Sequence, residues 1–137
     1  MSTKVDEKPK IVVIDDEGDF LTLMELWLKS LYTVTSLYGS EWTYKQVTAL
    51  EPDLILLDVN MPHEGGFDIC RQIRADPRFA NTPIIFLTGS ERAEDYRKHL
   101  RAGGTRFIHK GIGRGKLLEA LGEELRHEHE CADFDRR

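Results

Sequence analysis

Acidic, hydroxyl and basic residues follow four of the short apolar segments of this sequence, and their types are those that phosphoryl chemistry uses. They are Asp15 and Asp16 after the first segment, Asp58 after the third, Thr88 after the fourth and Lys110 after the fifth. If these side chains converge, the three carboxylates repel one another unless a cation lies among them. Because no His or Cys accompanies them, Mg²⁺ with oxygen ligands is expected rather than a soft metal.

A carboxylate that binds a metal ion and faces a lysine can act as a nucleophile toward phosphorus. Asp58 is therefore a candidate for an aspartyl phosphate. The metal would neutralise charge on the phosphoryl oxygens, Lys110 would pair with another oxygen, and the Thr88 hydroxyl would donate to a third. Gly89 leaves room for the phosphate. Each residue also has a purely structural explanation (helix cap, strand terminator or solvated charge), but five such residues at four strand ends favour a common site.

This chemistry requires a fold that brings distant residues to one rim, and the pattern of apolar segments predicts such a fold. The run 54–58, bounded by Pro52 and Pro62, is typical of a strand buried on both faces of a parallel sheet. Similar strands are expected at 11–14, 32–37, 84–87 and 105–109, alternating with helices at 19–31, 39–50, 67–75, 91–102 and around 117–125. The predicted class is α/β, a doubly wound five-stranded parallel sheet with helices on both faces.

In such a sheet, the carboxyl ends of the strands meet at one edge, where functional residues gather. The helices are expected to pack through apolar stripes. In the helix 19–31 the stripe is Phe20, Leu23, Met24, Trp27, Leu28 and Leu31, and in the helix 39–50 it is Trp42, Val47 and Leu50. The helix 91–102 has few apolar anchors, which indicates a mobile element or a docking face.

The length of 137 residues predicts one domain, and the net charge of −5 argues against non-specific binding to nucleic acid. The sequence has no apolar run long enough for a membrane span and no signal peptide, and its two cysteines have no metal-type spacing. We therefore expect a cytoplasmic protein without a disulfide framework. The expected organisation is a disordered N-terminus at 1–9, the domain at 10–128 and a polar tail or linker stump at 129–137.

On these motifs, the sequence resembles the receiver domains of two-component response regulators, most closely those of the stand-alone chemotaxis type. The resemblance covers about 10–128 and rests on Asp15-Asp16, the DVNMP stretch around Asp58, Thr88-Gly89-Ser90 and Lys110. It implies the flavodoxin-like receiver fold. It also implies that Asp58 takes a phosphoryl group from a phosphohistidine on a sensor histidine kinase or a phosphotransfer protein. The protein would be a phosphorylation-dependent signalling switch and not an enzyme.

The resemblance also implies the roles of further residues. The backbone carbonyl of Asn60 would complete the Mg²⁺ site of Asp15, Asp16 and Asp58. Thr88 and Phe107 match the family's switch pair, in which Thr88 moves to the phosphoryl group and the aromatic ring turns inward. The surface formed by the helix 91–102, the strand 105–109 and the last helix would then change for an unknown downstream protein.

Two positions tune dephosphorylation in the family, and one position departs from its pattern. Asn60 and Ser90 flank the path of an attacking water, and we predict an aspartyl phosphate lifetime shorter than hours. The family usually has Pro after the lysine with a cis peptide bond, whereas Lys110 precedes Gly111 here. Because a cis bond without proline costs about 3 kcal/mol, a trans peptide bond is expected.

Several rival interpretations are weaker. Haloacid-dehalogenase-type phosphatases also use Asp, Thr or Ser, Lys and Mg²⁺, but their second acid would fall at Asn60. The loop 111–116 lacks the spacing of a P-loop, and 127–131 lacks a partner cluster for a metal. A pseudo-receiver that docks without phosphorylation disagrees with the complete residue set. The chain is either a stand-alone regulator or phosphorelay shuttle, or the receiver of a longer protein.

Overall fold

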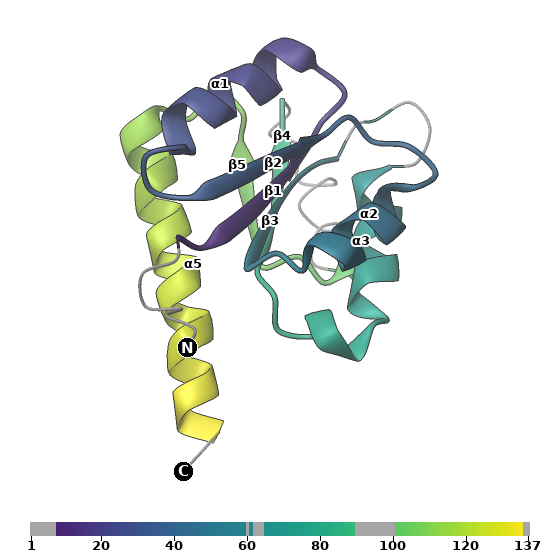
Figure 1. Ribbon diagram of the computed structural model, residues 1–137, viewed down its shortest axis with the longest axis vertical. Coiled ribbons are helices and arrows are strands. Elements are labelled where there is room, and N and C mark those ends of the chain that lie inside the picture. Colours follow the sequence, from purple (N-terminus) through teal and green to yellow (C-terminus); the bar gives the residue numbers. More distant parts are fainter. Residues whose placement is uncertain (1–7, 60, 62–64, 90–100, 136–137) are drawn as a thin grey trace.

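The computed structural model describes residues 8–59, 61, 65–89 and 101–135, with side chains described as far as residue 126. Its centre is a parallel sheet of five strands in the order β2-β1-β3-β4-β5. The strands are β1 (Lys10–Ile14), β2 (Thr33–Leu37), β3 (Leu54–Asp58), β4 (Ile84–Thr88) and β5 (Arg106–His109). The predicted doubly wound α/β class is confirmed, with all strands pointing the same way (Figure 1).

Helices cover both faces of this sheet. The helices α1 (Gly18–Leu28) and α5 (Arg114–Asp135) lie on one face, and α2 (Thr43–Leu50) and α3 (Gly66–Arg74) lie on the other (Figure 1). A short 3₁₀ helix, η2 (Pro77–Phe79), follows α3. The predicted helix 91–102 falls almost wholly outside the described residues.

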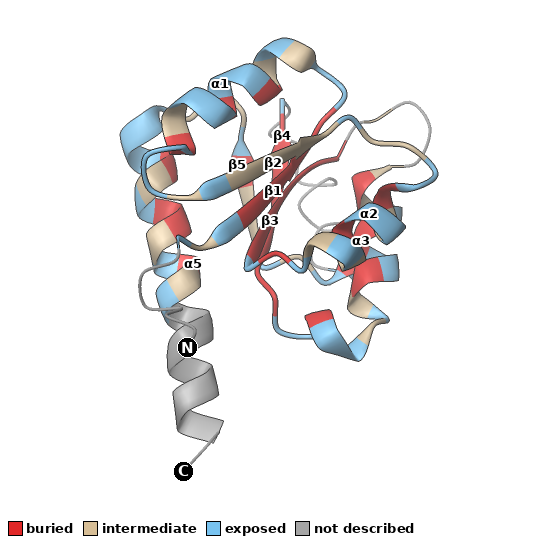
Figure 2. Ribbon diagram, in the orientation of Figure 1, coloured by how far each residue is buried: buried red, intermediate tan, exposed pale blue. Residues whose placement is uncertain are grey.

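The alternation of side chains along each strand divides the interior into two cores. On β1, Ile11 and Val13 face α1 and α5, whereas Val12 and Ile14 face α2 and α3. All five residues of β3 are buried, as predicted for a strand covered on both faces. Figure 2 shows the buried residues concentrated along the central strands and the inward sides of the helices. The carboxyl ends of the strands are thereby fixed by packing on both sides.

The packing of α1 and Trp42 differs from the prediction. The buried stripe of α1 is Leu21, Met24 and Leu28, whereas Leu23 is 37 % and Leu31 is 50 % exposed. Apolar residues occur almost all round this helix, so their spacing does not fix which side faces the sheet. Trp42 precedes α2 rather than lying within it, and it is 56 % exposed, with Lys45 Nζ 5.2 Å from its ring.

One arginine joins α3 to the segments that lead into β4 and β5. The half-buried guanidinium of Arg74 donates hydrogen bonds to the carbonyl oxygens of Phe79 and Thr82, both at 2.7 Å, and of Gly103 at 2.9 Å. It also donates to the Thr105 hydroxyl at 3.2 Å. These bonds fix where β5 begins, and hence where Lys110 emerges at its other end.

The ends of the chain add two observations. The carbonyl of Pro9 accepts a hydrogen bond from the Thr33 amide at 2.9 Å, so the described part of segment 1–9 is joined to β2. Helix α5 continues to Asp135, through most of the segment expected to be a tail. Among the residues with described structure, no helix has the length and apolar character required to cross a membrane.

Candidate functional site

The acidic residues predicted from the strand ends come together at the carboxyl edge of the sheet. Ile14 of β1 pairs with Leu57 of β3, so Asp15 and Asp58 occupy equivalent positions on neighbouring strands. One carboxylate oxygen from each of Asp15, Asp16 and Asp58 lies within 4.8 Å of the other two. Asp15 and Asp58 are buried, whereas Asp16 is exposed to solvent. The cluster therefore opens on one side only.

The two oxygens of Asp15 have different environments. Its Oδ1 accepts a hydrogen bond from the Glu17 amide at 2.9 Å. Its Oδ2 is buried and accepts no hydrogen bond from the described groups. The ammonium of Lys110 lies 2.7 Å from Oδ2 as an ionic partner. A buried carboxylate oxygen without a donor is costly unless a cation satisfies it.

Lys110 stands among the acids after β5, as predicted. Besides Asp15, its Nζ lies 2.9 Å from Glu17 Oε1 and 3.5 Å from Asp58 Oδ1. On another side it lies 4.9 Å from the centre of the Phe20 ring. Burial favours the neutral amine, but the contacts with Asp15 and Glu17 and the negative charge of Asp58 outweigh it, so the pKa of Lys110 is raised. The lysine therefore keeps its positive charge at neutral pH.

The predicted switch residues lie on adjacent strands. Thr88 ends β4 and is 1 % exposed, and its carbonyl accepts a hydrogen bond from the Lys110 amide at 2.7 Å. Phe107 of β5 pairs with Phe86 of β4 and packs, partly buried, against the core beneath α2 and α3. Thr88 therefore lies two residues after Phe86, the residue of β4 that is beside Phe107. Their role as a switch stays a prediction.

Two glycines define the space around Asp58. A Cβ at Gly66 would overlap the backbone carbonyl oxygen of Asp58, and it would lie 3.0 Å from the Asp58 carbonyl carbon and from Val59 Cα. Gly66 therefore allows α3 to begin directly against the strand end. At Gly89, no described atom lies within 4 Å of the position that a Cβ would take, which agrees with the expected room beside Thr88.

Sequence reasoning missed three contributors to this site. Glu17 is visible in the sequence as the third acid after β1, but its pairing with Lys110 across 93 residues is not. The spacing of apolar residues places Phe20 only in the packing stripe, and the turn formers place Gly66 only in a loop. Asn60 and Ser90, the predicted rate-tuning residues, lie outside the described part of the chain, as does the Asn60 carbonyl predicted for the metal.

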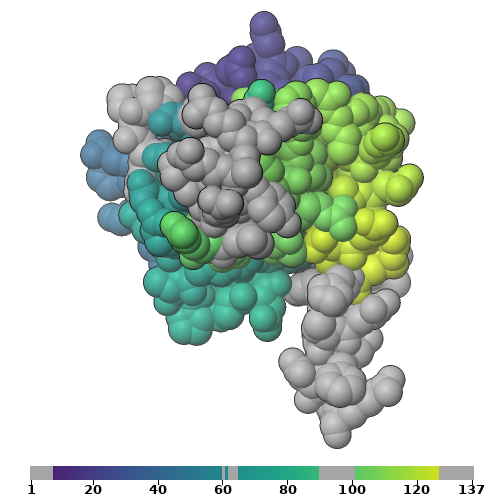
Figure 3. Space-filling model, turned by 180° about the vertical axis from the view of Figure 1, so that it is seen from behind, coloured from purple at the N-terminus to yellow at the C-terminus, as the bar shows by residue number. Residues whose placement is uncertain are grey.

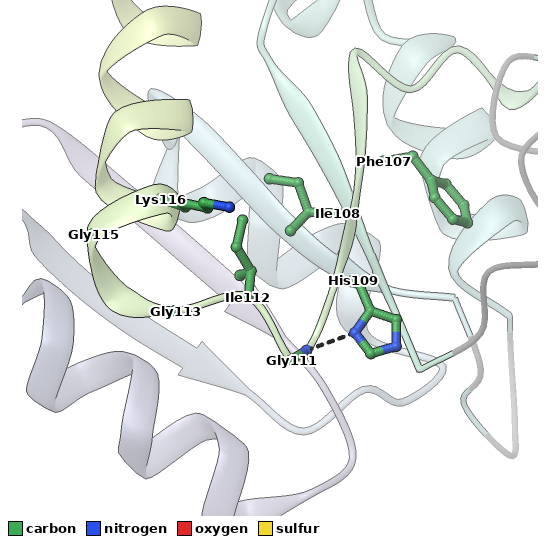
Figure 4. A pocket seen from close by; sticks show the side chains of 8 residues that line it. All are labelled: Phe107, Ile108, His109, Gly111, Ile112, Gly113, Gly115 and Lys116. Carbon is green, nitrogen blue, oxygen red and sulfur yellow. Dashed lines mark hydrogen bonds between the residues drawn. The ribbon is translucent and has the colours of Figure 1, made fainter.

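A groove runs beside the site between β5 and the start of α5, with a volume of about 740 Å³ (Figure 4). Its lining residues are Phe107, Ile108, His109, Gly111, Ile112, Gly113, Gly115 and Lys116. The Gly111 amide donates a hydrogen bond to His109 Nδ1 at 2.9 Å, which closes the turn after the strand. The peptide bond between Lys110 and Gly111 is trans, as predicted.

The donor set suits a hard divalent ion. It consists of carboxylate oxygens alone, which Mg²⁺ prefers, and no thiol or imidazole ligand belongs to the described cluster. Asp15 Oδ2 accepts no hydrogen bond from the described groups, and its cationic neighbour is the Lys110 ammonium at 2.7 Å. The residues present therefore fit Mg²⁺, and the open side beside Asp16 leaves space for water ligands.

Comparison with known proteins gives a consistent result. Residues 11–122 match the family described as the response regulator receiver domain. The regulatory protein VanR of Enterococcus faecium is 33 % identical over 118 residues, which are 85 % of this chain and 50 % of VanR. The transcriptional regulatory protein SpaR of Bacillus subtilis is 34 % identical over 119 residues, 87 % of this chain and 53 % of SpaR. This chain spans about half the length of these curated relatives.

Solved structures agree with the sequence matches. The BeF₃-activated N-terminal receiver domain of RstA from Klebsiella pneumoniae has a TM-score of 0.79 and 28 % identity. The match covers 85 % of this chain and 98 % of that one. The chemotaxis protein CheY4 of Vibrio cholerae has a TM-score of 0.80 and 24 % identity, with 85 % and 98 % of the two chains covered. The similarity to CheY4 supports the assignment of the fold alone.

Proposed function

Because this chain belongs to the response regulator receiver domain family of two-component systems, we propose that Asp58 is its phosphoacceptor. The donor would be a phosphohistidine on a sensor histidine kinase or a histidine phosphotransfer protein. One observation carries the proposal: carboxylate oxygens of Asp15, Asp16 and Asp58 lie within 4.8 Å of one another, and the Lys110 ammonium contacts Asp15 and Asp58. A phosphoryl group needs this combination of a nucleophilic carboxylate, metal-binding acids and a fixed positive charge.

Each residue has a defined part in the proposed transfer. A carboxylate oxygen of Asp58 forms a bond to phosphorus while the bond from phosphorus to the donor's histidine nitrogen breaks. Asp15, Asp16 and Asp58, with the backbone carbonyl of Asn60, would hold Mg²⁺. When bound, this ion supplies charge neutralisation at the phosphoryl oxygens. Lys110 pairs with a phosphoryl oxygen, and the Thr88 hydroxyl donates to another.

The transfer would change the surface through the switch pair. Thr88 moves toward the phosphoryl group, and Phe107 turns further into the core. Phe107 is among the residues that line the groove between β5 and α5, but its ring packs on the α2 and α3 side of the sheet, so its rotation would reach the groove through strand β5. Figure 3 shows β5 and the adjoining part of α5 exposed on the same side of the molecule. This face, with the segment 91–102, is the proposed site for a downstream protein.

The remaining parts of the proposal concern the protein's setting. The chain acts as a signalling switch with only its own phosphotransfer and dephosphorylation chemistry, not as a multiple-turnover enzyme. It works by protein contact in the cytoplasm, without direct binding to nucleic acid or to a membrane. The receiver domain comprises residues 10–128. Beryllofluoride activates the receiver domain in the RstA structure. We propose that this chain binds it as well.

Labelling with a small phosphodonor tests the proposed acceptor. We expect radiolabelled acetyl phosphate to modify the wild type once per chain, dependent on Mg²⁺, with an acid-stable but base-labile bond. Asp58→Asn should abolish the label, whereas Asp53→Asn, at the opposite end of β3, should keep it. Sustained turnover of a phosphatase substrate would instead favour the phosphatase alternative, and labelling of Asp58→Asn would contradict the assignment.

Two further measurements address the switch and the lifetime. Thr88→Ala should still accept the label while the amide resonances around the β5–α5 groove no longer respond to it. Loss of both properties would count against the switch assignment. If Asn60 and Ser90 act as proposed, the label on the wild type should decay in less than hours, and a label intact after a day would refute this.

A further inference from the structure

Glu17 contacts both an acid and the lysine of the site, namely Asp15 and Lys110. Its backbone amide donates to Asp15 Oδ1 at 2.9 Å, and its side-chain Oε1 accepts a hydrogen bond from Lys110 Nζ, also at 2.9 Å. The residue occupies the N-cap position of α1, yet its side chain makes no capping hydrogen bond. The side chains that commonly bond the free amides at this position are those of Ser, Thr, Asp and Asn. The side chain of Glu17 is directed to the lysine instead.

The position of the ammonium shows what this contact does. Nζ lies 2.7 Å from Asp15 and 2.9 Å from Glu17, but 3.5 Å from Asp58. Its resting place is therefore closer to Asp15 and to Glu17 than to the proposed acceptor. To pair with a phosphoryl group on Asp58, the ammonium has to leave or lengthen its contact with Glu17.

We propose that Glu17 is a positioning residue that holds the Lys110 ammonium in the resting state and competes with the phosphoryl group on Asp58 for it. This inference rests on the proposed function. The side chain of Glu17 is 65 % exposed, whereas that of Lys110 is 17 % exposed. A solvent-exposed partner forms a weak ion pair that can be exchanged at small cost. Glu17 thereby sets how readily the lysine is released.

Removing the charge of Glu17 should strengthen the binding of a phosphoryl mimic. With Mg²⁺ at saturation, we expect Glu17→Gln to bind beryllofluoride about two- to fivefold more tightly than the wild type, the range that an exposed ion pair allows. Labelling by acetyl phosphate should become faster by a similar factor. Both changes follow because the ammonium no longer has to give up its contact with the Glu17 carboxylate.

Two control variants separate the contact from the general loss of an acid. Asp19→Asn removes an exposed acid from the first turn of the same helix, where the described residues show no ion pair with Lys110. It should bind beryllofluoride like the wild type. Glu17→Asp keeps the charge but shortens the side chain by one carbon, which withdraws it from Nζ. It should behave like Glu17→Gln if the contact is decisive.

A metal-free measurement reports the contact itself. In the absence of Mg²⁺ and of any phosphodonor, Glu17→Gln should shift the side-chain resonances of Lys110, whereas Asp19→Asn should leave them in place. Equal beryllofluoride affinities for the wild type and Glu17→Gln would overturn the inference alone, and so would an Asp19→Asn variant that matches Glu17→Gln. A wild type that neither binds beryllofluoride nor accepts a label would overturn the proposed function as well.

Discussion

Replacing Gly66 by alanine should damage both the stability of the domain and the geometry of Asp58, the proposed acceptor. The added Cβ would overlap the carbonyl oxygen of Asp58, well inside the 3.0 Å below which real Cβ contacts essentially never fall. The obstacle is backbone of a strand buried on both faces, not the end of a flexible side chain. The start of α3 and the end of β3 must therefore separate by a shift on the order of 1 Å.

The size of the effect follows from this displacement. Overpacking of a buried site by one methyl group costs roughly 1–3 kcal/mol, and an unyielding backbone contact belongs at the upper end of that range. We expect Gly66→Ala to lower the free energy of unfolding by about 2–3 kcal/mol. A misplacement of about 1 Å at a reacting group can cost on the order of 100-fold in rate, so labelling of Asp58 should also slow markedly.

Urea denaturation followed by circular dichroism measures the first effect, and the initial rate of labelling by acetyl phosphate measures the second. Gly65→Ala is the matched control, because its Cβ would lie 3.8 Å from the Val59 carbonyl oxygen, the nearest atom among the described residues. It should change stability by less than about 1 kcal/mol and leave labelling intact. If Gly66→Ala were as stable and as rapidly labelled as Gly65→Ala, the reasoning would be refuted.

Three further variants or conditions have definite expected outcomes. Arg74→Ala should lower the free energy of unfolding in urea by about 3 kcal/mol, because several carbonyls lose a charged donor, whereas Arg71→Ala on the same helix should change it by under about 0.5 kcal/mol. Because the pKa of Lys110 is raised in the fold, the stability that its charge contributes is complete below the ordinary pKa of 10.5 and is lost as pH rises toward the folded value. The stability of the wild type relative to Lys110→Met should therefore decline above pH 10.5, and a constant difference would contradict this. Mg²⁺ at 100 times its dissociation constant should stabilise the wild type by about 2.7 kcal/mol in thermal melts, and Asp15→Asn at the same Mg²⁺ concentration by clearly less.

The sequence was sufficient to predict the sheet because each strand has its own signal. The apolar run before Asp58 has no polar residue for a solvent-exposed face. Such a strand is typical of the centre of a parallel sheet, where both faces are buried. Once the strands are parallel, the residue after each one is placed at a known edge. The meeting of Asp15, Asp16, Asp58 and Lys110 therefore follows from topology.

Side-chain reach and helix orientation could not be predicted in the same way. In α1, apolar residues on several sides give no unique buried stripe, so the spacing predicts an inward Leu23, which is exposed, and omits Leu21, which is buried. The large apolar side chain of Trp42 predicts that it is buried within the helix, but α2 begins only after this residue. The contact of Glu17 with Lys110 depends on how two loops approach across the rim, and single-sequence spacing carries no information about that distance.

The wide separation of the site residues along the chain has a consequence for the biosynthesis of this protein. Asp15 emerges from the ribosome long before Lys110, and the acids that follow β1 and end β3 have no contact with the Lys110 ammonium until β5 has joined the sheet. A nascent or truncated polypeptide that stops before β5 carries mutually repelling carboxylates at the sheet edge. Incomplete chains therefore lack the Lys110 ammonium that lies beside Asp15 and Asp58 in the complete sheet.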